Sequence, residues 1–195
     1  MRVVAGVARG IALSSPRGDG TRPITDRVKE TLFAILGDRV IEAQVLDLYA
    51  GSGAIGIEAL SRGAAHATFV ERGRRALAAI HANLERTRLT RDATVVAADV
   101  VGFLTAPPTR RYGLAFLDPP YEERAILAPL QRLTWHLAPG ATVVVKHFWR
   151  TELTLPADLV RVRERRFGET TLTFLSGPAG GQPLGDAGAN DEEDA

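Results

Sequence analysis

The segment FLDPPY, residues 116–121, contains side chains that could position an amine for attack on a methyl donor. Asp118 follows an apolar run, and Pro119 and Pro120 fix φ and carry no N–H group. A carboxylate and a rigid backbone carbonyl can accept both N–H bonds of an exocyclic nucleobase amine, which aims its lone pair. Tyr121 offers a face on which the base can stack. We therefore predict a catalytic corner at residues 118–121; the alternative is a proline-rich strand exit with a surface tyrosine.

A glycine motif, DLYAGSGAIG at residues 47–56, could bind the cofactor of such a reaction. Gly51, Gly53 and Gly56 spell G-x-G-x-x-G after a predicted strand and at the start of a predicted helix. Glu71 follows Gly51 by twenty residues, where a carboxylate can accept hydrogen bonds from both hydroxyls of a ribose. Taken alone, the three glycines would also suit an ordinary tight turn between a strand and a helix.

Three carboxylates end three successive predicted strands, and together they select the cofactor. Asp47 would approach a cationic amino group, Glu71 the ribose, and Asp99 the amino group of adenine. S-adenosylmethionine (SAM) carries an ammonium and a sulfonium, whereas NAD would bring an anionic pyrophosphate toward Asp47. The sequence therefore favours SAM, with NAD as the runner-up. Asp99 could instead serve as a helix N-cap.

Alternating strands and helices must position these residues. The apolar strands are nearly continuous, which is typical of a doubly wound α/β fold with a mostly parallel sheet. The last two strands have no room for a helix between them and should pair antiparallel. The predicted strands are residues 44–50, 66–71, 93–99, 112–118, 140–148 and two within 159–175; the predicted helices begin after Gly51 and cover 74–87 and 123–137.

An N-terminal extension, residues 1–40, precedes a predicted SAM-dependent methyltransferase domain at residues 41–176. We expect a β-hairpin from RVVA and IALSS, then a helix capped by Thr25 or Asp26 and stopped by Gly37. Basic residues gather in this extension and could contact RNA phosphates, although a solvated charged face is the alternative. The predicted RNA-binding residues are Arg2, Arg9, Arg22, Arg27 and Lys29.

Composition limits the other possibilities. The chain has no cysteine, and its four histidines lack ligand spacing, so we expect no metal site. No apolar run approaches the roughly 20 residues of a membrane span, and the N-terminus does not resemble a signal peptide. We therefore expect a cytoplasmic protein. Residues 177–195 form an acidic tail that we expect to be disordered; residues 1–175 carry 24 basic and 18 acidic residues, which suits a polyanionic partner.

These motifs together resemble a known family. RVVAGVARG, TRPITDRVKETLF, VLDLYAGSGAIGIEALSRGA, FLDPPY and RRFGETTLTFL are similar to segments of the bacterial 16S ribosomal RNA guanine-N2 methyltransferases, which are class I SAM-dependent enzymes. The resemblance implies a seven-stranded Rossmann-like sheet and methyl transfer from SAM to the exocyclic N2 amine of a guanine in 16S rRNA. We expect a monomer that acts within an assembling small ribosomal subunit.

The resemblance also assigns residues. It places SAM binding on Asp47, Gly51, Gly53, Glu71 and Asp99, and catalysis on Asp118, Pro119, Pro120 and Tyr121. Tyr121 stands where phenylalanine is common in the family, and Lys146 and His147 stand where many relatives have a glutamate; we assign these two no role. The remaining alternatives are a DNA adenine-N6 methyltransferase, a non-catalytic RNA-binding module with a degenerate SAM site, and, as the weakest, a nicotinamide oxidoreductase.

Overall fold

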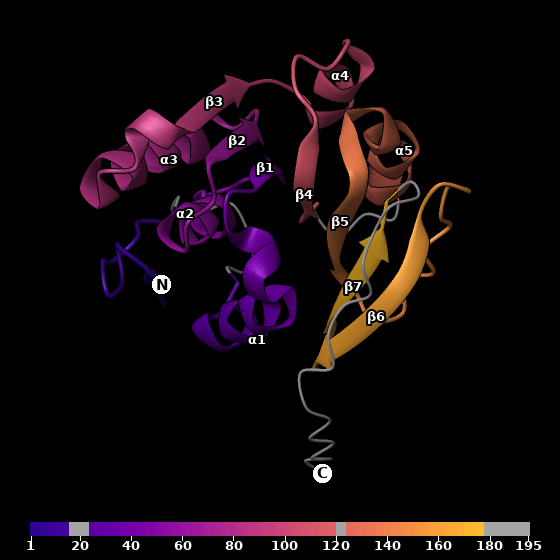
Figure 1. The fold of residues 1–195 in the computed structure, drawn as a ribbon, viewed down its shortest axis with the longest axis horizontal. Coiled ribbons are helices and arrows are strands. Elements are labelled where there is room, and N and C mark those ends of the chain that lie inside the picture. The colour runs from indigo at the N-terminus through magenta and orange to yellow at the C-terminus, as the bar shows by residue number, and fades with distance from the viewer. Residues whose placement is uncertain (16–23, 120–123, 178–195) are drawn as a thin grey trace.

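The computed structural model describes residues 1–15, 24–119 and 124–177, which form a seven-stranded sheet in the order β3-β2-β1-β4-β5-β7-β6 (Figure 1). The predicted doubly wound, seven-stranded fold is confirmed. The strand order reverses between β1 and β4, and ligands of such folds bind at that point. The strands are β1 (Gln44–Leu48), β2 (His66–Glu71), β3 (Ala93–Ala97), β4 (Tyr112–Leu117), β5 (Leu137–Phe148), β6 (Val160–Phe167) and β7 (Thr170–Ser176).

Strands β1 to β5 run parallel, and the two last strands depart from that pattern. β7 lies antiparallel between β5 and β6, so the closing pair is antiparallel as predicted and also extends the sheet. Strand β6 forms the edge and carries four arginines between Val160 and Phe167. Charged residues on an edge strand discourage pairing with other chains.

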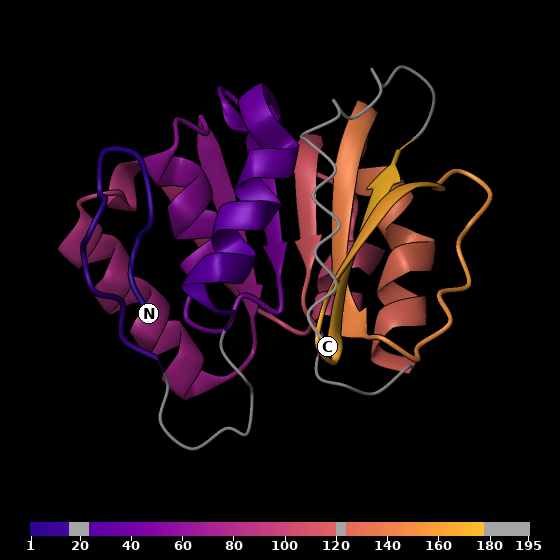
Figure 2. The same ribbon diagram turned by 90° about the horizontal axis from the view of Figure 1, so that it is seen from below.

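Helices cover both faces of the sheet (Figure 2). On one face α1 (Asp26–Leu36), α2 (Ala54–Ser61) and α3 (Arg74–Thr87) pack on a core that includes Val45 and Phe116. On the other, α4 (Val100–Thr105) and α5 (Arg124–Leu133) pack on a core that includes Leu46 and Leu117. Neighbouring residues of one strand thus enter opposite cores, as the two-residue period of a strand requires. Three short 3-10 helices complete the order: η1 (Gly37–Val40), η2 (Thr90–Asp92) and η3 (Thr134–His136).

The ends of helix α1 are those that the sequence predicts. The Thr25 side chain accepts a hydrogen bond from the Val28 N–H at 3.3 Å, which is an N-cap. Gly37 ends the helix with φ of 53°, a conformation that glycine adopts without strain. The short helix α4, in contrast, was not predicted, because six residues are too few to show a helical period.

The N-terminal segment, residues 1–15, turns back on itself as an antiparallel hairpin. Around a bridge between Arg2 and Ala12, the N–H groups of Val3 and Leu13 donate to the carbonyls of Ile11 and Met1, each at 3.0 Å; the pairing is too short to count as two regular strands. The segment also lies against the helical layer, and Val3, Ala8 and Leu13 are buried in the same core as α1 and α2. The hairpin is therefore held both by its own backbone hydrogen bonds and by contacts with the rest of the chain.

No helix within the described ranges is long and apolar enough to cross a membrane. The predicted acidic tail begins at Gly177, which donates a hydrogen bond to the Ala141 carbonyl at 2.7 Å. The rest of the predicted tail, residues 178–195, lies outside the described residues.

Candidate active site at the carboxyl edge of the central strands

Four ionisable side chains meet on one face of the sheet at the carboxyl ends of adjacent strands. Because alternate residues share a face, Asp47 on β1, Glu71 on β2, Asp118 after β4 and Lys146 on β5 all lie on the side of α1, α2 and α3. The Asp118 N–H also donates to the Leu48 carbonyl at 3.4 Å, which ties the end of β4 to β1. The predicted cofactor and catalytic carboxylates are therefore neighbours.

Glycine is needed at the two ends of the glycine loop for different physical reasons. Gly51 has φ of 57°, and a Cβ built there would meet no atom closer than 3.9 Å, so this face of the loop is open. At Gly56 an added Cβ would lie 2.3 Å from the Phe69 ring, so only glycine lets α2 pack this closely on β2. The loop is therefore open at Gly51 and closely packed at Gly56, as expected of a loop that a ligand approaches.

Glu71 holds the glycine loop and the start of α3 at once. Its Oε2 accepts a hydrogen bond from the Gly51 N–H at 2.9 Å, and its Oε1 accepts from the N–H groups of Arg72 and Gly73 at 2.8 Å. A carboxylate has about four acceptor positions, so capacity remains for a hydroxyl group. The structure thus gives Glu71 a local role that sequence reasoning did not find, beside its predicted contact with ribose.

Asp47 is a buried carboxyl group, with 2 % of its surface exposed. Its Oδ2 accepts a hydrogen bond from the Gly56 N–H at 3.0 Å. Burial raises the pKa of Asp47 to about 8; the hydrogen bond opposes that rise, and the nearby carboxylates of Asp118 and Glu71 add to it. A buried acid that holds its proton near neutral pH is well placed to ionise against an incoming cation.

Asp99 follows β3 by two residues and caps α4. Its Oδ1 accepts a hydrogen bond from the Gly102 N–H at 3.1 Å, and its Oδ2 lies 3.7 Å from Nη1 of Arg72. The N-cap alternative is therefore confirmed. The side chain is half exposed, so the cap also leaves acceptor capacity open to solvent.

Lys146, to which the sequence analysis assigned no role, belongs to this site. Its Nζ lies 2.8 Å and 2.9 Å from the two carboxylate oxygens of Asp118, so the ammonium contacts both. Burial raises the pKa of Asp118, and the charge and hydrogen bonds of Lys146 act against that rise. A single lysine late in a strand gives no signal for this contact, which depends on the register of β4 against β5.

Tyr49 is a further residue of this site that the sequence analysis did not predict. It lies between Asp47 and Gly51 and has φ of 59°, in the left-handed region that a bulky residue adopts only at a cost. Strained backbone of this kind is concentrated at functional sites. Here it turns the chain out of β1 and into the glycine loop.

Several predicted residues lie outside the described ranges. These are Pro120 and Tyr121 of the catalytic corner and Arg22 of the basic group. Pro119 is described and buried beside Asp118. No group of histidine, cysteine or carboxylate side chains that could hold a metal ion occurs within residues 1–15, 24–119 and 124–177.

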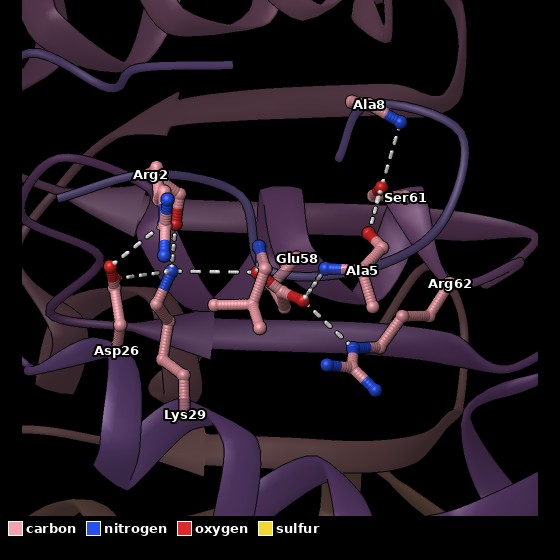
Figure 3. Close-up of polar contacts among 9 residues, drawn as sticks. Arg2, Ala5, Ala8, Asp26, Lys29, Glu58, Ser61 and Arg62 are labelled. Carbon is pink, nitrogen blue, oxygen red and sulfur yellow. Dashed lines mark hydrogen bonds and ion pairs between the residues drawn. The ribbon is translucent and has the colours of Figure 1, made fainter. Parts of the chain in front are cut away.

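The predicted RNA-binding residues of the N-terminal extension divide into two kinds. Arg2, Arg9 and Arg27 are exposed. Lys29 is fully buried, with its Nζ 3.4 Å from Oε2 of the equally buried Glu58 on α2 (Figure 3). The prediction that Lys29 contacts RNA phosphates is therefore wrong, because its ammonium points into the protein.

Glu58 shows why Lys29 is buried. Its two oxygens accept hydrogen bonds from the N–H groups of Val4 and Ala5 at 2.8 Å and 3.0 Å, and Arg62 donates to Oε1 at 2.8 Å (Figure 3). Lys29 also donates to the Arg2 carbonyl. The two charges therefore attach the N-terminal segment to α1 and α2, and this is a structural role.

A second attachment joins the N-terminal segment to the glycine loop. Asn83 on α3 is fully buried; its Oδ1 accepts from the Ser14 N–H at 2.8 Å, and its Nδ2 donates to the carbonyls of Ser14 and Ser52, each at 2.9 Å. Ser52 lies within the glycine loop. One amide thus holds the end of the described N-terminal segment against that loop.

The strand order, the glycine loop and the carboxylates at one edge define a SAM-dependent methyltransferase of the Rossmann-like class. Comparison with known proteins agrees. A family model described as "Conserved hypothetical protein 95" matches residues 1–176, so the chain belongs to that family. "Ribosomal RNA small subunit methyltransferase D" of Escherichia coli K12 is 36 % identical over 186 residues, which cover 93 % of this chain and 92 % of that protein.

Two further matches cover nearly the whole chain. "Putative rRNA methyltransferase YlbH" of Bacillus subtilis is 39 % identical over 175 residues, covering 87 % of this chain and 95 % of the relative. The solved structure of "Putative methyltransferase yhhF" from Escherichia coli superposes with a TM-score of 0.82 at 35 % identity, covering 92 % and 99 % of the two chains. The family and the fold are thus supported by independent comparisons.

Proposed function

We propose that this protein transfers a methyl group from SAM to the exocyclic N2 amine of a guanine in 16S ribosomal RNA. One observation carries the proposal: Asp118 ends β4 on the same sheet face as Asp47 and Glu71, beside the glycine loop. An acceptor for a nucleobase amine and a cofactor site thus occupy one edge. The family and its relatives named as rRNA methyltransferases support the substrate class.

The residues at this edge fit SAM. Bound SAM supplies an electrophilic methyl group on a sulfonium. The open face at Gly51 leaves room for a ligand, Glu71 retains acceptor capacity for a ribose hydroxyl, and Asp47 would ionise against the amino group. Asp99 would accept from the adenine amino group. Asp47, Glu71 and Asp99 are all carboxyl groups, and a pyrophosphate beside Asp47 would be repelled by its ionised form, which argues against NAD.

Asp118 orients the nucleophile. Its carboxylate accepts one N–H bond of the target amine, and the backbone carbonyl beside Pro119 accepts the other. Both hydrogen bonds strengthen as the nitrogen gains positive charge in the transition state. The rate gain comes from orientation and charge stabilisation at one nitrogen atom. Tyr121 would stack on the guanine ring, as the sequence predicts.

The N-terminal extension, residues 1–40, would contact the RNA. Arg2, Arg9 and Arg27 are exposed there, and Arg22 lies outside the described residues. Because Asn83 and Glu58 fasten residues 1–15 to the cofactor side of the fold, RNA held by these arginines would lie near the glycine loop. We further propose that the protein acts as a monomer on an assembling small subunit in the cytoplasm.

Mapping the product tests this proposal. Small subunits from a strain that lacks the gene are incubated with the purified protein and isotopically labelled SAM, and the digested RNA is analysed by mass spectrometry. We expect the label in N2-methylguanosine at one position of 16S rRNA. Label in adenine, in DNA or in no nucleic acid would contradict the proposal. Wild-type subunits, in which the site is already methylated, are the control.

A further inference from the structure

The contact between Lys146 and Asp118 joins the end of β4 to β5. Leu117 on β4 is in register with Val145 on β5, so Asp118, directly after β4, lies beside Lys146, which is still within β5, on one face of the sheet. The lysine side chain is 12 % exposed and the aspartate 27 %, so water reaches this pair only partly. Both carboxylate oxygens lie within 2.9 Å of the ammonium.

Two charged groups act on Asp118 from the neighbouring strands. Lys146 on β5 favours the ionised carboxylate, and the carboxyl group of Asp47 on β1, when ionised, disfavours it. On the helical side, Phe33 of α1 packs at a ring distance of 6.1 Å on Phe116, two residues before Asp118, and adds apolar surface. Burial and Asp47 thus oppose ionisation, and Lys146 supports it.

We propose that Lys146 is a positioning residue that keeps Asp118 ionised, and therefore a hydrogen-bond acceptor, when RNA and cofactor cover the site. This inference rests on the proposed function of Asp118 toward the target amine. An exocyclic amine presents N–H donors, and a carboxylate has only acceptors to offer. A protonated carboxyl group would present an O–H toward an amine that has no comparable acceptor, and the alignment would be lost.

The contact with Lys146 leaves the Asp118 carboxylate able to accept a hydrogen bond from the target amine. Lys146 occupies one position on each oxygen, and about two of the four acceptor positions remain for the substrate. Bound RNA would remove the remaining water from Asp118, which raises the cost of its charge. The positive charge of Lys146 therefore stabilises the Asp118 carboxylate most when RNA and cofactor are bound.

A purely structural role for Lys146 predicts a different result. If the pair served only to join β4 to β5, loss of the lysine would lower activity by the same factor at every pH. If Lys146 keeps Asp118 ionised, its loss must raise the pH at which Asp118 loses its proton, and with it the acid limb of the rate profile. The pH profile therefore separates the two roles.

The test measures single-turnover methylation of small-subunit RNA by wild type, Lys146→Met and Lys146→Arg as pH rises. Arg132→Met on α5, whose side chain donates to the Ala128 carbonyl of its own helix at 3.1 Å, is the matched control. For Lys146→Met we expect a loss of at least tenfold near neutral pH, recovered at high pH, with the acid limb moved up by about one unit or more. Lys146→Arg should restore most of the rate, and the control should equal wild type.

A second readout does not depend on activity. Carbon-13 NMR of the Asp118 carboxyl group, assigned with Asp118→Asn, should show its titration at higher pH in Lys146→Met than in wild type. Lys146→Gln replaces Lys146→Met if the latter does not fold. Unshifted titration and a uniform loss of rate would overturn the inference. Wild-type protein that makes no N2-methylguanosine would refute the proposed function instead, and the NMR result would still decide the role of Lys146.

Discussion

At the scale of single residues, the site shows how burial sets the chemistry of carboxylates. Asp47 and Asp118 both have raised pKa values, and burial is the main cause in each. Their partners differ. Asp47 has a backbone N–H from Gly56, whereas Asp118 has the ammonium of Lys146. The first is thus prepared to lose a proton when a cation arrives, and in our proposal Lys146 keeps the second ionised.

The first prediction concerns Asp47 and the pH dependence of cofactor binding. In the free protein this carboxyl keeps its proton up to a pKa of about 8. An ammonium beside it lowers that pKa in the complex, so binding releases a proton. Affinity for SAM should therefore rise with pH, by at most about tenfold per unit, and level off above about pH 8. Calorimetry in two buffers of different ionisation enthalpy measures the released proton.

Asp47→Asn is the control for this prediction. The amide keeps the shape and cannot ionise, so proton release and pH dependence should both disappear while affinity falls. The same pH dependence in Asp47→Asn as in wild type would show that another group gives up the proton, and that the amino group of SAM lies elsewhere.

At the scale of elements, the sequence predicts most of the scaffold and part of the site. Apolar strands, Thr25 and Gly37 at the ends of α1, and the order of carboxylates follow from local patterns, and the fold confirms them. The contact of Lys146 with Asp118, 28 residues apart, depends on strand register, which no local pattern fixes. The burial of Lys29 likewise requires knowing that Glu58 faces α1.

The packing of α2 on β2 gives the second prediction. Gly56→Ala places a methyl group 2.3 Å from the Phe69 ring. Alanine favours a helix over glycine by about 1 kcal/mol, but overpacking costs about 1–3 kcal/mol, and this contact is closer than a rigid sheet can accommodate. Urea unfolding should show a net loss of stability and weaker SAM binding.

Gly113→Ala is the matched control, because a Cβ there meets nothing within 4 Å and the residue, at a register shift in β4, is not in the left-handed region. Its stability should equal that of wild type. Equal stabilities of Gly56→Ala and Gly113→Ala would mean that α2 moves away from β2 at little cost.

The attachment of the N-terminal segment gives the third prediction. Lys29→Met leaves the fully buried Glu58 without one of its two cationic partners, and breaking a buried ion pair costs about 3 kcal/mol. Denaturant unfolding should show that loss, while the salt dependence of RNA binding in the folded variant stays the same.

Arg9→Met is the control, and we expect the opposite result. Because Arg9 is exposed, its loss should leave stability unchanged and reduce the salt dependence of RNA binding. If Lys29→Met were as stable as wild type but bound RNA more weakly, Lys29 would contact RNA after all. Deletion of residues 1–15 cannot make this distinction, because Val3, Ala8 and Leu13 belong to the core.

At the scale of the whole molecule, charge is divided unevenly along the chain. Residues 1–175 carry 24 basic and 18 acidic residues, and the last twenty residues add five acids and no base. Residues 1–175 therefore have the excess of positive charge that favours binding to an RNA backbone.

Removal of residues 178–195 is the fourth prediction. The cut falls after Gly177, whose hydrogen bond to Ala141 is kept, so the sheet loses no contact that the structure describes. Methylation of small subunits at about 0.15 M salt, where charges beyond about 8 Å are screened, should stay within about twofold of the full chain. A loss of activity beyond that would assign the acidic tail a role in the reaction.

The central claim is that Asp118 orients the target amine while other residues bind the cofactor. Its most direct test is single-turnover methylation by Asp118→Ala, with SAM affinity measured on the same protein. Loss of one preorganised electrostatic contact typically lowers the rate by about a hundredfold or more, and that loss is expected here with SAM affinity within a few-fold of wild type. An unchanged rate, or a rate loss explained entirely by weaker SAM binding, would contradict the account.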